Sequence, residues 1–237
     1  MGIDMKDGLV HVCFVIDESG SMWDSTSDVV GGFKKVITEQ KAVKDGGCIV
    51  SLYKFSDKVS QIYLGKDVNE IDEDKLVYSP GGCTAMNDGI GTAIDEIGKW
   101  LADKDESERP EKNLIVIMTD GYENASHEYT IEQVRERIKH QTEKYNWSFI
   151  YMGTDVTDST YANTIVGGIS GCTTSYNSRS NYAANYSIIS SGVKSFRRMA
   201  NVDTLTKSAL FDQELDESAE QLTAEYEKET GNLINRA

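Results

Sequence analysis

Three short runs of apolar residues recur along the chain, and each is followed at once by a polar or glycine-containing segment. They cover residues 9–16, 113–118 and 147–152. Most of their positions are apolar, and many are β-branched or aromatic. A strand that is covered on both faces needs this composition, because neither of its faces meets water. The three runs therefore predict central strands of a parallel sheet.

Between these runs, apolar residues recur at the three- and four-residue spacing of amphipathic helices. The clearest helical segments cover residues 28–40, 90–101 and 130–144. Weaker patterns predict a short helix over 155–165 and a longer one over 182–199. Helices alternating with buried strands are typical of sheets whose strands are connected by crossovers.

Residues 48–55 and 58–64 form two alternating runs that are separated only by a turn at Ser56 and Asp57. This spacing predicts an antiparallel hairpin that places one strand at an edge, and residues 168–174 predict a last, weak strand. We therefore expect an α/β fold: a doubly wound, mostly parallel sheet with one antiparallel edge strand and helices on both faces.

The composition changes near residue 202, where acidic residues increase and apolar residues become sparse. We predict one domain over residues 1–202 and an acidic, helical extension over residues 203–237, which either packs on the domain or stays mobile. Its carboxylates could reach a metal of the same chain or of a neighbouring chain. Those considered are Asp212, Glu214, Asp216, Glu217 and Glu220.

The chain is strongly acidic, with a formal net charge of −15. This charge repels phosphate backbones and anionic lipids, so we expect neither nucleic acid nor membrane as a partner. Residues 1–10 lack the apolar core of a signal peptide, and no apolar run is long enough to span a bilayer. A cytoplasmic location follows as an expectation.

The four cysteines and three histidines are scattered without metal-binding spacing. We expect free, buried thiols and histidines that serve the core or the surface. Cys83 could report redox state at the rim of a site, but a spectator thiol is favoured because it has no basic neighbour. These residues are Cys13, Cys48, Cys83, Cys172, His11, His127 and His140.

Polar residues gather in three loops that end strands or precede a helix. Asp17, Ser19 and Ser21 follow the first apolar run, and Asp120 follows the second. Thr84 lies in the glycine-rich loop before the second predicted helix. Because the carboxyl ends of parallel strands meet at one edge of a sheet, we expect these side chains to converge.

The five side chains offer two carboxylates and three hydroxyls, which are hard oxygen donors. They suit Mg²⁺, or Mn²⁺, and do not suit zinc, which prefers thiolate and imidazole. The protein donors do not fill an octahedral shell, so a position stays open for an oxygen from outside. An incoming carboxylate is favoured, because neutral hydroxyls leave the cation strongly electrophilic.

Three segments of the sequence carry a specific likeness: Asp17-x-Ser19-x-Ser21, Gly82-Cys83-Thr84-Ala85-Met86-Asn87-Asp88 and Thr119-Asp120-Gly121. In residue types, order and strand context they resemble the metal-ion-dependent adhesion site of von Willebrand factor A-type domains. The resemblance extends from about residue 9 to about residue 200, and it implies a metal site at all five of the side chains named above. Further details resemble an intracellular bacterial and phage branch of that family: Ser21-Met22-Trp23, Gly31-Gly32-Phe33, Gln40-Lys41 and the segment 84–88.

The resemblance implies a protein-interaction module, not an enzyme, in which Mg²⁺ accepts an Asp or Glu from a partner protein. An alternative is a structural or assembly protein whose metal only stabilises the fold. A magnesium-dependent hydrolase or phosphotransferase with Asp17 as nucleophile is disfavoured. Ser19 stands where enzymes resembling haloacid dehalogenases carry an acidic proton shuttle, and no Gly-x-x-x-x-Gly-Lys loop is present.

Several neighbours of the motif have simpler interpretations. Asn87 and Asp88 are expected to cap the helix that follows them, and Glu18 and Asp155 are expected to face solvent. Trp23 is either an exposed anchor for a partner or packs against a neighbouring loop.

Overall fold

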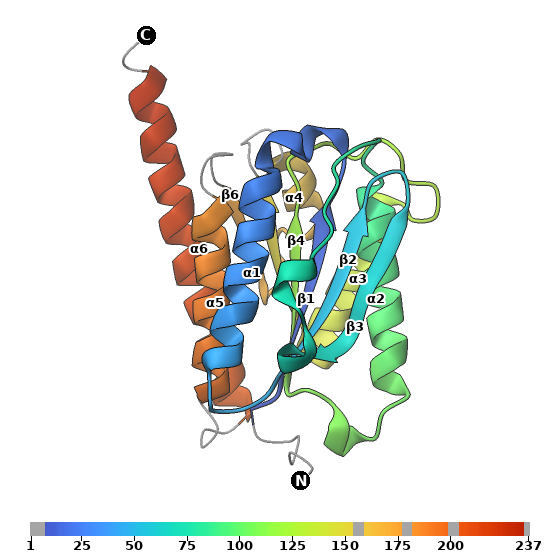
Figure 1. Cartoon of the computed structure of the whole chain (residues 1–237), viewed down its shortest axis with the longest axis vertical. Coiled ribbons are helices and arrows are strands. Elements are labelled where there is room, and N and C mark those ends of the chain that lie inside the picture. Colours follow the sequence, from blue (N-terminus) through green and yellow to red (C-terminus); the bar gives the residue numbers. More distant parts are fainter. Residues whose placement is uncertain (1–7, 154–158, 177–181, 199–203, 235–237) are drawn as a thin grey trace.

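The computed structural model describes residues 8–153, 159–176, 182–198 and 204–234 (Figure 1). Within these ranges, the strands are β1 (Val10–Asp17), β2 (Cys48–Phe55), β3 (Val59–Asp67), β4 (Lys112–Met118), β5 (Ser148–Gly153) and β6 (Cys172–Tyr176). The α-helices are α1 (Thr26–Ala42), α2 (Met86–Ala102), α3 (Ile131–Tyr145), α4 (Ser159–Ile165), α5 (Tyr182–Arg198) and α6 (Thr204–Ile234). Short 3-10 helices are η1 (Gly20–Ser25), η2 (Val68–Glu70), η3 (Glu73–Lys75) and η4 (Glu106–Glu108).

The strands form one sheet in the order β3-β2-β1-β4-β5-β6. Every neighbouring pair is parallel except β2 and β3, which form the antiparallel hairpin at one edge. The chain builds β2 and β3 on one side of β1 and then crosses to place β4 on the other side. This arrangement confirms the predicted fold class.

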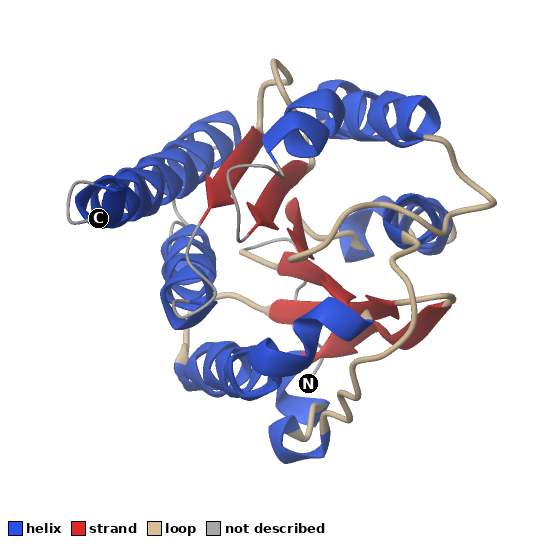
Figure 2. Cartoon of the chain, turned by 90° about the horizontal axis from the view of Figure 1, so that it is seen from above, coloured by secondary structure: helices blue, strands red, loops and turns tan. Residues whose placement is uncertain are grey.

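Helices cover both faces of the sheet, as the view from above shows (Figure 2). Residues alternate along β1 between two hydrophobic clusters: Val12 and Phe14 belong to one, Cys13 and Val15 to the other. The first cluster includes residues of α1, α5 and α6, and the second includes residues of α2, α3 and α4. A strand buried in this way on both faces explains the near-continuous apolar runs of the sequence.

Two boundaries differ from the predicted ones. The helix α2 begins at Met86, before the apolar stripe that predicted it from residue 90. The polar residues of its first turn are helical but do not continue that stripe. The last strand begins only at Cys172, because Gly168 and Gly171 have φ angles of +72° and +78°, which are incompatible with a continuous strand. Residues 155–158 of the predicted short helix lie outside the described residues.

The first half of α6 packs against α5 and β6. Phe211 is fully buried and meets Phe196 of α5 with a ring-centroid distance of 4.9 Å in an edge-to-face arrangement. Leu215 is buried in the same cluster as β1. The second half of this 31-residue helix extends past the rest of the molecule (Figure 1). Across the described residues, neither α6 nor any other helix has the apolar length needed to cross a membrane.

Two acidic residues of α6 are bonded to strands of the sheet. Asp212 forms a salt bridge of 2.9 Å with Lys112, the first residue of β4, and accepts a hydrogen bond from Ser148, the first residue of β5. Asp216 accepts a hydrogen bond from Thr173 of β6. Both strands β4 and β5 begin at the amino edge of the sheet, so the suggestion that Asp212 reaches its own metal is wrong.

Candidate metal centre

The predicted donors lie at the carboxyl edge of the sheet, which is the upper edge in Figure 1. Asp17 is the last residue of β1, and Asp120 follows β4 by two residues. These strands are parallel neighbours in which Ile16 pairs with Met118. The register therefore brings the two carboxylates to the same place, as the sequence predicted.

Gly121 marks the point where three loops converge. A Cβ atom built on this glycine would lie 3.2 Å from Ser21 Oγ, 3.4 Å from Thr84 Oγ1 and 3.6 Å from Asp17 Oδ2. Ser19 joins the group, because its Oγ lies 3.1 Å from Ser21 Oγ. Residues that are far apart in the sequence thus direct oxygen atoms toward one small volume.

Two buried carboxylates dominate the electrostatics of this volume. Asp17 accepts hydrogen bonds from the backbone N–H of Ser19 (2.7 Å) and from Thr119 Oγ1 (2.6 Å), which are both neutral donors. Burial, with a further contribution from the charge of Asp120, raises the pKa of Asp17 to about 6, and the hydrogen bonds offset this only in part. Because Asp120 is also buried, a divalent cation would relieve the repulsion between two acids in a poorly hydrated site.

Backbone hydrogen bonds fix the loop that follows β1. The Glu18 N–H donates to Phe55 O (2.7 Å), and the Gly20 N–H donates to Gly82 O (3.2 Å). Gly82 has a φ angle of +78°, and a Cβ there would lie 2.2 Å from Asp57 Oδ2. Only glycine suits this position, so the glycine-rich loop can run beside the loop that follows β1, which we call the metal loop (residues 17–21).

The loop after β4 holds the loop that carries Thr84. Asn124 Oδ1 accepts from the Thr84 N–H (2.9 Å), and the Asn124 N–H donates to Thr84 O (3.1 Å). Glu123 accepts from the backbone N–H of Asn87 (2.8 Å) in the first turn of α2, where helix N–H groups lack helical partners. The sequence does not indicate the roles of Glu123 and Asn124. Both side chains bond to backbone N–H groups, which every residue except proline has, so no pattern of residue types marks these contacts.

The prediction that Asn87 and Asp88 cap α2 is wrong. The N-cap of this helix is Ala85, which makes no side-chain cap. Asp88 instead accepts the backbone N–H groups of residues 127–129, each at 2.9 Å. Asn87 Oδ1 accepts from Tyr161 Oη. Both side chains start from the first turn of α2 and bind neighbouring segments rather than their own helix.

The neighbours of the metal loop also differ from one another in exposure. Glu18 was expected to face solvent, but it forms a 2.6 Å salt bridge with Lys54 and accepts the Ser79 N–H at 2.7 Å. Glu18 turns from solvent because β2 places the ammonium of Lys54 beside the end of β1. Asp155 lies outside the described residues. Trp23 is 70% exposed, which favours the first of its two interpretations.

Cysteine and histidine do not contribute to the centre. All four thiols are free; Cys13 and Cys48 are buried, but Cys83 is exposed, so the expectation of a buried thiol is wrong there. Asp57 raises the pKa of Cys83, which makes its thiolate scarce. His11 is a core residue bonded to Asn113 and Ser51. The described residues contain no group of three or more His, Cys, Asp and Glu side chains that could hold a metal.

The donor set fits a hard divalent cation. It combines two carboxylates with three hydroxyls, has no sulfur or imidazole, and is buried except at Ser21. These properties match the oxygen preference of Mg²⁺ and Mn²⁺.

Comparison with known families agrees with the fold. The model of the von Willebrand factor type A domain matches residues 11–185. The chain belongs to the von Willebrand factor type A domain family. A search of curated proteins found none that matches this chain.

Solved structures share the fold of this von Willebrand factor type A domain at low sequence identity. The type V pili tip protein Mfa5 domain from Porphyromonas gingivalis has a TM-score of 0.61 and 11% identity, covering 83% of this chain and 99% of that chain. The PilB minor pilin from Streptococcus sanguinis has a TM-score of 0.58 and 14% identity, covering 81% and 63%. Proximal thread matrix protein 1 from the mussel byssus, with a zinc-occupied metal-ion-dependent adhesion site, has a TM-score of 0.54 and 17% identity, covering 81% and 46%. The chain thus matches about half the length of this mussel protein.

Proposed function

We propose that the chain is a divalent-metal-dependent protein-interaction module. When bound, Mg²⁺ would accept a carboxylate oxygen from an Asp or Glu of a partner protein. The observation that carries this proposal is the approach of three donors, from three loops, to within 3.6 Å of one point beside Gly121. The proposed ligands are Asp17, Ser19, Ser21, Thr84 and Asp120.

The exposure of the donors supports a site that a partner can reach. Asp17, Ser19, Thr84 and Asp120 are buried, whereas Ser21 is exposed. The protein therefore surrounds the proposed metal position from below and leaves an approach past Ser21. A mussel relative carries zinc in this kind of site, which supports a divalent cation in this family. The hard donor set favours magnesium for this chain, and the two metals should be compared directly.

Peptide display tests the function. A library with one fixed central Asp is selected on the full chain, once with Mg²⁺ and once with chelator, and the Asp17→Ala chain serves as control. We expect binders that need Mg²⁺ and that lose binding when the central Asp is changed to Asn. Binders that tolerate chelator, the amide or the Asp17→Ala chain would contradict an interaction through the metal and the partner's carboxylate.

We also propose that the chain has no hydrolytic activity of its own. The donor loop supplies the hydroxyls of Ser19 and Ser21 where a hydrolase would need a general acid. Incubation with ATP and with a generic phosphate ester should give no turnover above background. Turnover that disappears in Asp17→Asn would contradict this assignment. A cytoplasmic location and the intracellular bacterial and phage branch stay predictions.

A further inference from the structure

Two exposed aromatic residues lie close in the sequence to proposed metal ligands. Trp23 is 70% exposed and follows Ser21 by two residues, whereas Tyr122 is 59% exposed and follows Asp120 by two residues. They come from different loops, which meet where Ser21 Oγ approaches Gly121. Each of the two segments that meet beside the centre thus carries one exposed aromatic residue.

Fixed backbone presents both side chains. Thr26 Oγ1 donates to Trp23 O at 2.8 Å, and the preceding Met22 is fully buried. On the other loop, Thr119 Oγ1 accepts the Gly121 N–H at 3.1 Å. Removing an exposed indole or phenol ring from water is favourable, so a partner that covers these rings gains binding free energy. The entropy cost of ordering is small when the backbone is already fixed.

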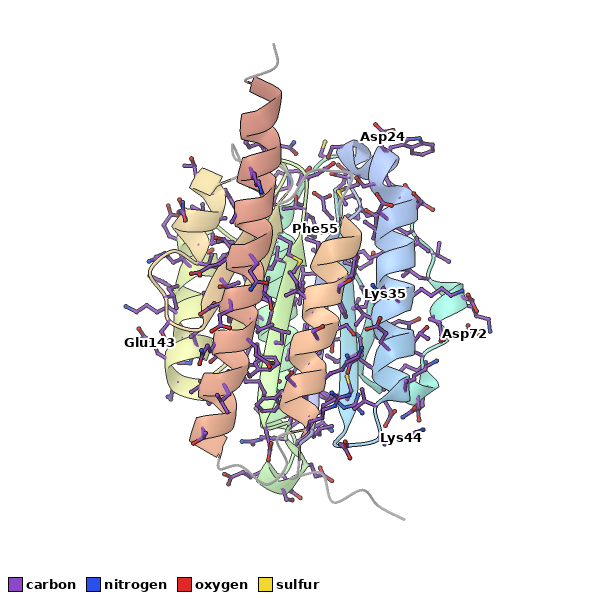
Figure 3. All side chains as sticks on the ribbon, turned by 90° about the vertical axis from the view of Figure 1, so that its left-hand side faces the viewer. Asp24, Lys35, Lys44, Phe55, Asp72 and Glu143 are labelled. Carbon is purple, nitrogen blue, oxygen red and sulfur yellow. The ribbon has the colours of Figure 1, made fainter. Side chains whose placement is uncertain are left out.

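The charge around the centre defines the partner further. Asp24, beside Trp23, is exposed and lies at the upper end of the molecule (Figure 3). Asp57 is exposed on the turn beside the glycine-rich loop, and the whole chain has a net charge of −15. A partner with many acidic residues, including a second copy of this chain, is repelled by this field.

We propose that Trp23 and Tyr122 form an aromatic rim that selects the sequence around the partner's carboxylate. The occupant is a segment of another protein with a single Asp or Glu next to large apolar residues and with Lys or Arg nearby. This inference rests on the proposed function, because the carboxylate needs the metal. Trp and Tyr suit the role, since they bury large areas at interfaces and lose few rotamers.

The test uses the same fixed-Asp library on the parent chain, on Trp23→Ala and on Tyr122→Ala. Tyr145→Ala is the matched control, because Tyr145 is also an exposed aromatic, 54% exposed, but lies at the end of α3. Magnesium-dependent binders of the parent should be enriched in apolar residues beside the Asp and in Lys or Arg. Their affinity should fall about tenfold or more in each rim variant and stay unchanged in Tyr145→Ala.

Separate outcomes distinguish the two proposals. The Mn²⁺ affinity of the rim variants should equal that of the parent, which shows that the metal centre and the fold are intact. Magnesium-dependent binders without apolar enrichment, or with unchanged affinity for both rim variants, would overturn the aromatic rim and leave the function standing. If the parent yields no magnesium-dependent binder, the proposed function fails, and the rim fails with it.

Discussion

Two buried sites at opposite edges of the sheet treat charge in opposite ways. At the amino edge, the buried Lys112 is paired with Asp212 at 2.9 Å, so the charges are matched within the chain. At the carboxyl edge, Asp17 and Asp120 are two buried acids close enough to raise a pKa, and the hydrogen-bond donors to Asp17 are neutral. Paired charges stabilise the fold, whereas neighbouring like charges are the arrangement that the proposed cation would neutralise.

The largest expected effect concerns the amino edge. Asp212→Ala leaves the buried ammonium of Lys112 without its carboxylate, which should lower the free energy of unfolding by about 3–5 kcal/mol. Denaturant unfolding in chelator measures this loss. The Lys112→Met, Asp212→Leu double variant is the control and should recover most of it, because it removes both charges. An unchanged stability of Asp212→Ala would show that α6 does not close this edge.

The stability of the chain should depend on pH through His11, near the amino end of β1. Burial lowers the pKa of His11 to about 4 in the folded chain, against about 6.5 when unfolded. The unfolded chain therefore binds the extra proton between these values, and stability falls as pH falls from about 6.5 to 4, by at most ~3 kcal/mol.

The matched variant for this prediction is His11→Gln, which cannot titrate. Asp17 titrates in the same range with the opposite sign, because its folded pKa is raised, so the difference between parent and variant isolates His11. Denaturant unfolding at pH 7 and at pH 4.5 supplies the values. Equal pH dependence in parent and His11→Gln would contradict a neutral, buried His11.

A smaller effect is expected when one methyl group enters the carboxyl edge. The Gly121→Ala methyl would lie 3.2–3.6 Å from three proposed donors, so it should weaken Mn²⁺ binding about tenfold, which is ~1.4 kcal/mol. Stability in chelator should change by less than about 0.5 kcal/mol. Gly31→Ala is the control, since nothing lies within 4 Å of that added atom. Equal Mn²⁺ affinity in parent and Gly121→Ala would place the metal elsewhere.

The smallest effect concerns the loop that positions Thr84. Asn124→Ala removes the acceptor of the Thr84 N–H and should cost ~1 kcal/mol, or about fivefold, in Mn²⁺ affinity. Asn69→Ala is a suitable control, because that amide bonds to Asp67 on the exposed surface. Calorimetry would show whether Asn124→Ala matches the parent, in which case the loop holds Thr84 without this side chain.

The sequence predicted most of the fold, because buried parallel strands and amphipathic helices leave distinct apolar patterns. It predicted β6 but placed its start four residues too early, because two left-handed glycines, Gly168 and Gly171, precede the strand. It also left the docking of α6 open, although Phe211, Leu215 and Ala219 are buried at four-residue spacing. That stripe is too narrow to be distinguished from a solvated helix among so many acidic residues.

The candidate site could be predicted because its donors belong to a motif of residue types at strand ends. Their supporting network could not, because Glu123, Asn124 and Asp88 bond to backbone groups about 40 residues away in the sequence. The backbone has the same donors at nearly every position, so such contacts carry no sequence signal. Only the folded chain shows which side chains hold the metal loops together.

Titration calorimetry of Mn²⁺ and Mg²⁺ into the parent, Asp17→Ala and Thr84→Ala tests whether the proposed side chains bind a metal. We expect one cation bound to each parent chain, and an affinity for either ion that is at least tenfold lower in both variants. Ser27→Ala serves as the control, because Ser27 is an exposed hydroxyl in the first turn of α1. Affinities of Asp17→Ala and Thr84→Ala within twofold of the parent would contradict the assigned ligands.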